Sequence, residues 1–348
     1  MGYQKEKETI RPPMLNVVVL YNLLERLQKG EEKDILAEDG ILEEIGAVEE
    51  AIHTLGHQCY VLAVREEIFT VIHWLREIRP DIVFNLCESV YGNSCWEMNI
   101  PALLELFQIP YTGSPPLTLG LCQDKGKVKD ILLSQGIQTP RYQIVERPSA
   151  PMRIPLFPLI VKPLHEDGSL GISKESVVFD EKALKRQIRY ILDRYHQPAL
   201  VEEFIEGREL NVSLMETNGK MEVLPISEID YSEFPEGIPR ICGYEAKWMQ
   251  ESLEYQRSKP ICPARLKEGI RNRIEQISAQ VFKLFRCRDY ARIDLRLNPE
   301  GEIYIIEVNP NPDISPQSGM TRSIKTQGMT YAEFIGNLLE RALQRRSS

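Results

Sequence analysis

Four polar side chains between residues 290 and 309 are the clearest candidates for chemistry in this sequence. Arg292 and Asp294 lie in one run of alternating apolar and polar residues, and Glu307 and Asn309 lie in the next. A short stretch containing proline and glycine separates the two runs, which predicts an antiparallel hairpin. Because side chains two positions apart share a face of a strand, we expect one face of this hairpin to carry all four.

The chemistry of these side chains is that of a hard metal ion. Asp294, Glu307 and Asn309 offer two carboxylates and an amide, which are ligands that Mg²⁺ accepts together with water and phosphate oxygens. Arg292 would face the same phosphates or a developing oxyanion. The alternative is a solvated polar face on a half-buried sheet. Two consecutive strands with converging polar positions favour the metal site.

Composition narrows the classes of function. The 348 residues include 42 basic and 51 acidic side chains, a formal net charge of −9, which argues against a nucleic-acid or membrane-surface role. No apolar run reaches membrane-spanning length, and the charged N-terminus lacks a signal-peptide core, so a cytoplasmic protein is expected. Seven cysteines without a C-x-x-C pair are typical of free thiols.

The elements that must position these residues fall into three parts. Strand and helix patterns alternate up to residue 86, which predicts an α/β domain over residues 14–120 with a doubly wound parallel sheet. Longer antiparallel patterns follow and predict an α+β arrangement, divided into residues 121–210 and 211–348. A stretch at 230–259 is irregular and long enough for a lid. Residues 331–343 are expected to form a last surface helix.

A glycine-containing loop follows the strand that ends in Lys162. Gly168 and Gly171 would let backbone N–H groups approach and bind a polyphosphate. An ordinary surface turn is the alternative, because the loop has neither P-loop nor dinucleotide-binding spacing. The absence of a glycine-rich fingerprint after Leu20 also argues against a dehydrogenase.

Acidic residues on the next strand could hold a nucleoside. Glu202 and Glu203 end this strand, and Glu209 follows Gly207. A carboxylate accepts hydrogen bonds from both an amino group and a hydroxyl, so these side chains suit adenine and ribose. A solvated strand end is an equally good interpretation of the same residues.

Taken in order, these motifs resemble the ATP-grasp superfamily, and specifically enzymes similar to D-alanine:D-alanine ligase, from about Val17 to Met320. Any one motif is weak evidence, but their joint order and spacing strongly favour this fold and the use of ATP. The stretches that carry the resemblance are Ile109 to Ser114, Asp124-Lys125, Pro158 to Ser173, Val201 to Leu210, Tyr244 to Lys247, Cys262 to Ala264, Ala291 to Asp294 and Glu307 to Ser318.

The resemblance implies a role for each candidate residue. It implies an ATP-dependent ligase that phosphorylates a carboxylate and lets an amine attack the activated carbonyl. The implied positions are Lys125, Lys162 and Ser169 at the phosphates, Glu202, Glu203 and Ile205 at adenine, Glu209 at the ribose, Lys247 at the terminal phosphate, Asp294, Glu307 and Asn309 at two Mg²⁺ ions, and Arg292 at the acyl phosphate and the tetrahedral intermediate.

Departures from the family pattern concern the substrate. A glutamate, a serine and a tyrosine that cooperate at the first amino acid in dipeptide-forming relatives correspond here to Asp39 (or Glu38), Gly168 and Trp248. A glycine that supplies a backbone donor is replaced by Asp313. Such changes reshape a pocket built on hydrogen bonds.

We therefore expect an amino acid as the incoming amine and an acceptor other than D-alanine. Ser318 remains to hold the carboxylate of that amino acid. One related branch joins an amino acid to mycosporine-glycine, and this chain could belong to it. A true dipeptide ligase and a non-catalytic nucleotide sensor are the alternatives. The expected partners are small molecules and a second copy of the chain, with no nucleic acid or membrane.

Overall fold

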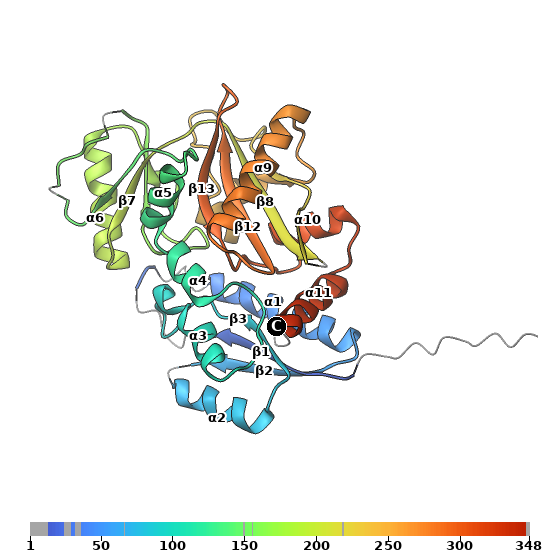
Figure 1. The fold of residues 1–348 in the computed structure, drawn as a ribbon. Coiled ribbons are helices and arrows are strands. Elements are labelled where there is room, and N and C mark those ends of the chain that lie inside the picture. The colour runs from blue at the N-terminus through green and yellow to red at the C-terminus, as the bar shows by residue number, and fades with distance from the viewer. Residues whose placement is uncertain are drawn as a thin grey trace, which may run out of the picture.

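The computed structural model describes residues 13–23, 29–31, 36–65, 67–148, 150–154, 156–217 and 219–345, without the side chains of 36–39. Three sheets with helices packed on them make up this part of the chain (Figure 1). None of its helices is both long and apolar enough to cross a membrane.

The first sheet is parallel, as the alternating pattern predicts. Its strands are β1 (Asn16–Asn22), β2 (Gln58–Val64) and β3 (Ile82–Leu86), in the order β2-β1-β3. The connecting helices are α1 (Leu36–Thr54) and α2 (Ile68–Ile78). All five residues of β3 are buried, as in a parallel sheet covered on both faces.

Two further helices lead out of this sheet. A 3₁₀ turn, η2 (Ser94–Trp96), is followed by α3 (Asn99–Leu106). Tyr111 then forms a parallel bridge with Val83 at the sheet edge. The next helix, α4 (Pro116–Cys122), was not predicted; it begins with proline at a position where the ring suits a helix.

The second sheet is antiparallel, with strand order β4-β7-β5-β6. It brings the strand that carries Lys162 beside the strand that carries Glu202, because Ile160 pairs with Glu202. The elements of this part are α5 (Lys125–Ser134), β4 (Tyr142–Val145), β5 (Leu159–Pro163), η3 (Lys174–Ser176), β6 (Val177–Val178), α6 (Glu181–Tyr195) and β7 (Ala199–Glu203).

The third sheet contains the predicted hairpin. Its order is β11-β10-β8-β12-β13, with β9 paired to β8. Arg292 pairs with Asn309 and Asp294 with Glu307, so the predicted hairpin is confirmed. The elements are β8 (Arg208–Thr217), β9 (Lys220–Val223), β10 (Ser227–Asp230), β11 (Lys259–Ile261), α9 (Glu268–Leu284), β12 (Tyr290–Leu297) and β13 (Ile303–Asn309).

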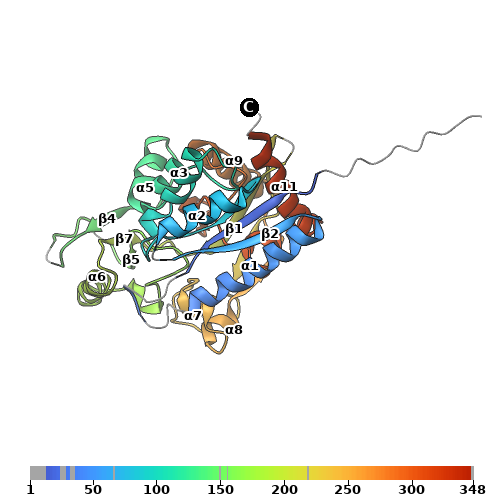
Figure 2. The same cartoon turned by 90° about the horizontal axis from the view of Figure 1, so that it is seen from below.

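The segment predicted to be an irregular lid contains two short helices, α7 (Tyr244–Trp248) and α8 (Leu253–Arg257). Each has only five residues, which is too short for a recognisable helical period. Figure 2 shows both beside the first turns of α1.

Two helices end the described chain, α10 (Gly319–Gln327) and α11 (Tyr331–Gln344). The prediction of a surface helix at 331–343 is wrong in one respect, because one face of α11 is fully buried. Phe334 and Leu338 join the core formed by α1 and the first sheet. The division into residues 14–120, 121–210 and 211–348 stays a prediction.

Candidate active site

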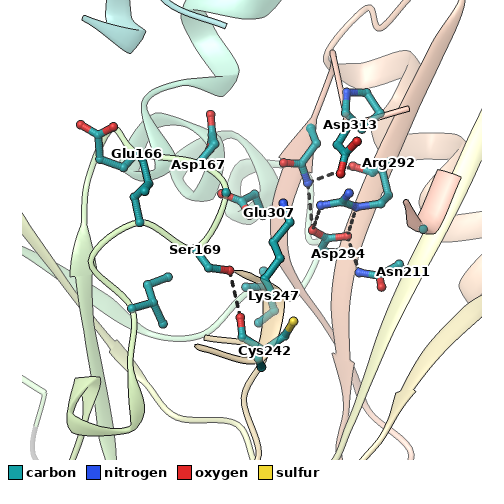
Figure 3. Close-up of a pocket in the computed structure, with 18 of the residues that line it drawn as sticks. Glu166, Asp167, Ser169, Asn211, Cys242, Lys247, Arg292, Asp294, Glu307 and Asp313 are labelled. Carbon is teal, nitrogen blue, oxygen red and sulfur yellow. Dashed lines mark hydrogen bonds and ion pairs between the residues drawn. The ribbon is translucent and has the colours of Figure 1, made fainter. Parts of the chain in front are cut away.

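One large cavity of about 1380 Å³ lies where the elements of the three sheets meet. Most predicted site residues line it, although they come from distant parts of the chain. These are Lys125, Lys162, Ser169, Glu202, Glu203, Ile205, Glu209, Lys247, Arg292, Asp294, Glu307, Asn309 and Ser318. Figure 3 shows Arg292, Asp294 and Glu307 on the hairpin facing Ser169 and Lys247.

The polar face of the hairpin is tightly connected. Arg292 donates two hydrogen bonds of 2.8 Å to the two oxygens of Asp294. The side-chain amides of Asn211 and Asn309 donate to the same carboxylate at 2.7 and 3.0 Å. Burial opposes the charge of Arg292, but Asp294 raises the pKa of Arg292 above its usual range. The predicted convergence of these side chains is therefore present.

Lys125 joins the hairpin to the glycine-containing loop. Its ammonium is buried and lies 2.7 Å from Asp167 and 2.8 Å from Glu307. It also donates to the backbone carbonyl of Glu166 at 2.6 Å. Burial opposes both charges, but the two carboxylates raise the pKa of Lys125, and the lysines at 125 and 162 lower that of Glu307. Both groups are thus held in their charged forms.

A second buried charge cluster lies on the adenine side predicted for the site. Glu202 contacts Lys162 at 2.9 Å and Lys129 at 2.6 Å, and all three side chains are almost completely buried. Lys129 also donates to Thr139 at 2.8 Å. Burial raises the pKa of Glu202, but the two lysines outweigh this effect and lower it below the usual value. Burial lowers the pKa of Lys129 to about 8.

Lys129 was missed by the sequence reasoning. It lies four residues after Lys125 on α5, a spacing that places both side chains on one helix face. That spacing could have indicated Lys129 as a second site lysine. Its contact with Glu202 could not be predicted, because Lys129 and Glu202 are far apart in sequence.

The glycine-containing loop packs against the segment before and within α7. Gly168, Ser169 and Gly171 all have positive φ, between 63° and 71°, which explains the glycines at two of these positions. The Ser169 hydroxyl donates to the Cys242 carbonyl at 2.9 Å. The Tyr244 amide donates to the carbonyl of Ile172 at 2.7 Å. The loop is therefore attached to the predicted lid.

Three residues predicted for adenine and ribose have partners within the protein. Glu203 forms an ion pair with Arg141 at 3.2 Å. Glu209 accepts from Arg296 at 2.6 Å and from the Tyr231 hydroxyl at 2.8 Å. The carbonyl of Ile205 accepts from Arg296 at 3.3 Å. Arg296 thus holds both Ile205 and Glu209 in place, a role that the sequence did not reveal.

Trp248 connects three elements of the site. Its indole N–H donates to the Gly168 carbonyl at 3.0 Å, and the ammonium of Lys247 lies 4.6 Å from the centre of its ring. A Cβ atom at Gly40 of α1 would lie only 2.8 Å from the indole. Trp248 therefore fills the space between α1 and the loop.

The remaining predicted residues lie near α10 and α1. The Ser318 hydroxyl caps α10 by accepting from the Thr321 amide at 3.2 Å. Asp313 accepts from the Ser315 amide at 2.8 Å. Asp39 and Glu38 belong to the backbone of α1, but their side chains lie outside the described residues.

Two buried carboxylates at this end were not predicted. Glu44 on α1 accepts from the Ile314 amide at 2.8 Å, and Glu97 lies close to Asn311. Burial raises the pKa of both well above the usual range for glutamate. Their sequence contexts carried no signal, since an acidic residue on a helix usually faces water.

The hairpin oxygens fit a hard cation. Glu307 Oε1 is buried and lacks a hydrogen bond of good geometry, although Lys125 lies near it. Asp294 stands opposite Glu307 in the register, and Asn309 adds an amide oxygen. Within the described ranges no three His, Cys, Asp or Glu side chains form a metal cluster, so the amide would be part of the ligand set.

Comparison with known proteins gives one family. The family model described as "D-ala D-ala ligase C-terminus" matches residues 132–340. An uncharacterized protein, y4sG, of Sinorhizobium fredii is 33% identical over 302 residues, which cover 85% of this chain and 86% of that protein. A D-alanine–D-alanine ligase of Aquifex aeolicus is 32% identical over 297 residues, covering 84% of this chain and 92% of that enzyme.

Solved structures share the fold. A D-alanine–D-alanine ligase from Bacillus anthracis complexed with ATP has a TM-score of 0.70 at 21% identity, covering 96% of this chain and 99% of that one. The VanG D-Ala:D-Ser ligase from Enterococcus faecalis has a TM-score of 0.69 at 18% identity, covering 95% and 100%. The predicted ATP-grasp fold is thereby confirmed.

Proposed function

Because this chain belongs to the D-alanine–D-alanine ligase family and is an ATP-dependent ligase, we propose that it joins an amino acid, through its amine, to an acceptor activated by phosphorylation. The observation that carries the proposal is the convergence on one cavity of Lys125 and Lys162 with the Arg292–Asp294 pair and Glu307. Such a set suits phosphoryl transfer followed by attack of an amine.

The chemistry follows from charge. A carboxylate is a poor electrophile, and turning its oxygen into a phosphate supplies a leaving group. Lys125 and Lys162 would neutralise the transferring phosphate, and Arg292 would stabilise the oxyanion that forms when the amine attacks. Mg²⁺, when bound by Asp294, Glu307 and Asn309, would neutralise the triphosphate. Two such ions would be bound.

The nucleotide would lie between the two antiparallel sheets. Its adenine would contact Glu202, Glu203 and Ile205, its ribose Glu209, and its terminal phosphate Lys247 beside Ser169. Support comes from the related Bacillus anthracis enzyme, which was solved in complex with ATP. All these residues line the cavity here.

The acceptor would differ from D-alanine. Trp248 occupies the space between Gly40 and Gly168, where smaller or hydroxyl-bearing side chains would be needed to hold a first alanine. Loss of such hydrogen bonds changes selectivity strongly. A conjugated ketone such as mycosporine-glycine is one candidate acceptor. The alternative is a dipeptide ligase that accepts D-alanine at both positions.

The test is amine-dependent release of ADP from ATP and magnesium, with a panel of amino acids and of carboxylate or ketone acceptors. Lys162→Ala is expected to lower this rate at least about 100-fold, because a phosphate would lose its neutralising charge in a low-dielectric site. Lys185→Ala, at an exposed position of α6, is the control. Unchanged turnover in Lys162→Ala would contradict the phosphate site, and efficient D-alanyl-D-alanine synthesis would contradict the altered acceptor.

A further inference from the structure

Cationic side chains that line the cavity are mostly neutralised by a carboxylate. Six have such a partner within 4.0 Å; they are Lys29, Lys125, Lys162, Lys259, Arg292 and Arg296. Among the described residues, Lys247 and Arg322 line the cavity without one. Lys247 has a proposed role at the terminal phosphate, whereas Arg322 has none.

Neutral groups hold the Arg322 guanidinium in place. One of its terminal nitrogens donates to the Ser227 hydroxyl at 3.4 Å, and the other donates to the Gln317 carbonyl at 3.0 Å. Burial lowers the pKa of Arg322, and the charge of Arg292 lowers it further. A guanidinium has five N–H donors and no acceptor, so this group retains free donors and an uncompensated charge.

Gly319 puts no side chain between Arg292 and Arg322, and all three residues line the cavity. A Cβ atom there would lie 4.0 Å from a terminal nitrogen of Arg322 and 3.9 Å from the Arg292 side chain. Ser318 is the N-cap of α10, and the Arg322 backbone amide donates to its carbonyl at 3.1 Å, so the two residues are neighbours at the start of the helix.

We propose that Arg322 binds the side-chain carboxylate of the attacking amino acid, so that the amine substrate is a dicarboxylic amino acid such as aspartate or glutamate. This rests on the proposed function, in which Ser318 holds the α-carboxylate. Arg322 reaches back along α10 to the carbonyl of Gln317, so its guanidinium lies beside the Ser318 end of the helix and faces the same cavity. Gly319 leaves room for the methylene groups between them.

The chemistry favours an acid over its amide. A guanidinium binds a carboxylate through two parallel charge-assisted hydrogen bonds, which are about twice as strong as neutral ones. An amide would fill the same space but would leave the charge of Arg322 uncompensated and would place donors against its N–H groups. The site should therefore discriminate between isosteric acid and amide side chains.

The experiment compares kcat/KM for aspartate with asparagine and for glutamate with glutamine, each as both enantiomers, by ADP release from the full-length chain. Wild type is expected to prefer the acid of at least one pair about 10-fold to 100-fold. Arg322→Gln should abolish the preference while ADP release with the amide continues. Arg271→Gln, at an exposed position of α9, is the matched control.

A binding measurement gives a second readout. Calorimetric titration of the chain with the preferred acid, in the presence of a non-hydrolysable ATP analogue, should show a Kd about 10-fold weaker in Arg322→Gln than in wild type. Equal or greater activity with the amides, or an acid preference that survives in Arg322→Gln, would overturn the role of Arg322. Absence of ADP release with every amino acid would instead overturn the proposed function, and this inference with it.

Discussion

At the scale of single residues, most charges of the site are already paired inside the protein. Arg292 is bound to Asp294 and Lys125 to Glu307. Because an isolated buried charge is costly, these pairs keep the lysines and carboxylates ionised. A bound nucleotide with its metal would exchange these partners for phosphate oxygens and ions.

Lys129 illustrates the dependence of one residue on another. Glu202, proposed to contact adenine, has Lys129 at one oxygen and Lys162 at the other. We expect Lys129→Met to raise KM for ATP about 10-fold, since hydrogen bonds to charged groups are worth 1.5–3 kcal/mol. Without this lysine, burial raises the pKa of Glu202, so that the carboxylate protonates more readily and the defect grows as pH falls.

The measurement is KM for ATP across the pH range in which the wild type is stable. Lys127→Met is a suitable control, because Lys127 lies on the same helix and is exposed. A KM for ATP that stays at the wild-type value at every pH would show that Lys129 does not position Glu202.

At the scale of elements, the site depends on how α1, α7 and the glycine-containing loop pack together. Trp248 joins all three, through a hydrogen bond to Gly168 and contact with Gly40. A loop held in this way should be ordered together with the predicted lid. The proposed first-substrate subsite would thus be formed by the packing between these elements.

Two glycines of α1 test this packing. In Gly40→Ala the new Cβ would lie 2.8 Å from the indole, so Trp248 must move and its hydrogen bond should break. We expect altered tryptophan emission and a fall in kcat/KM of about 10-fold, the loss of roughly one hydrogen bond. Gly46→Ala meets no atom within 4 Å and should only stabilise the helix, by about 0.5–1 kcal/mol. Identical emission and kcat/KM in both variants would contradict the contact.

At the scale of the whole molecule, α11 completes the hydrophobic core that α1 and the first sheet form. Phe334, Ile335 and Leu338 of α11 pack into one core with Val48 and Ile52 of α1. Residues more than 250 positions apart therefore share a single hydrophobic core, as Figure 1 shows where α11 crosses α1. The segment that contains α1 and the first sheet should therefore unfold together with α11.

Leu338 tests this connection. Its side chain is fully buried, so Leu338→Ala should lower the free energy of unfolding by about 2–5 kcal/mol through lost burial and a cavity. Leu133→Ala, at an exposed position of α5, should change it by less than about 0.5 kcal/mol. Urea denaturation followed by circular dichroism makes the comparison. Equal midpoints for the two variants would show that α11 does not support the core.

Homodimer formation and a cytoplasmic location stay predictions from the sequence.

Local pattern determined much of this protein from sequence alone. The alternation around Arg292, Asp294, Glu307 and Asn309 predicted both the hairpin and its shared polar face, because strand period and turn chemistry act over a few residues. The strand before Lys162 and the parallel sheet were predictable for the same reason. Short helices such as α7 were not, since five residues contain little more than one helical turn.

Tertiary structure alone decided which distant residues became neighbours. The contacts of Lys129 with Glu202, of Trp248 with Gly40 and of α11 with α1 leave no trace in local periodicity. The position of Ser318 and Arg322 in one cavity likewise depends on the strands and loops that surround α10. Burial and charge pairing are properties of the packed chain, and the sequence specifies them only through the fold as a whole.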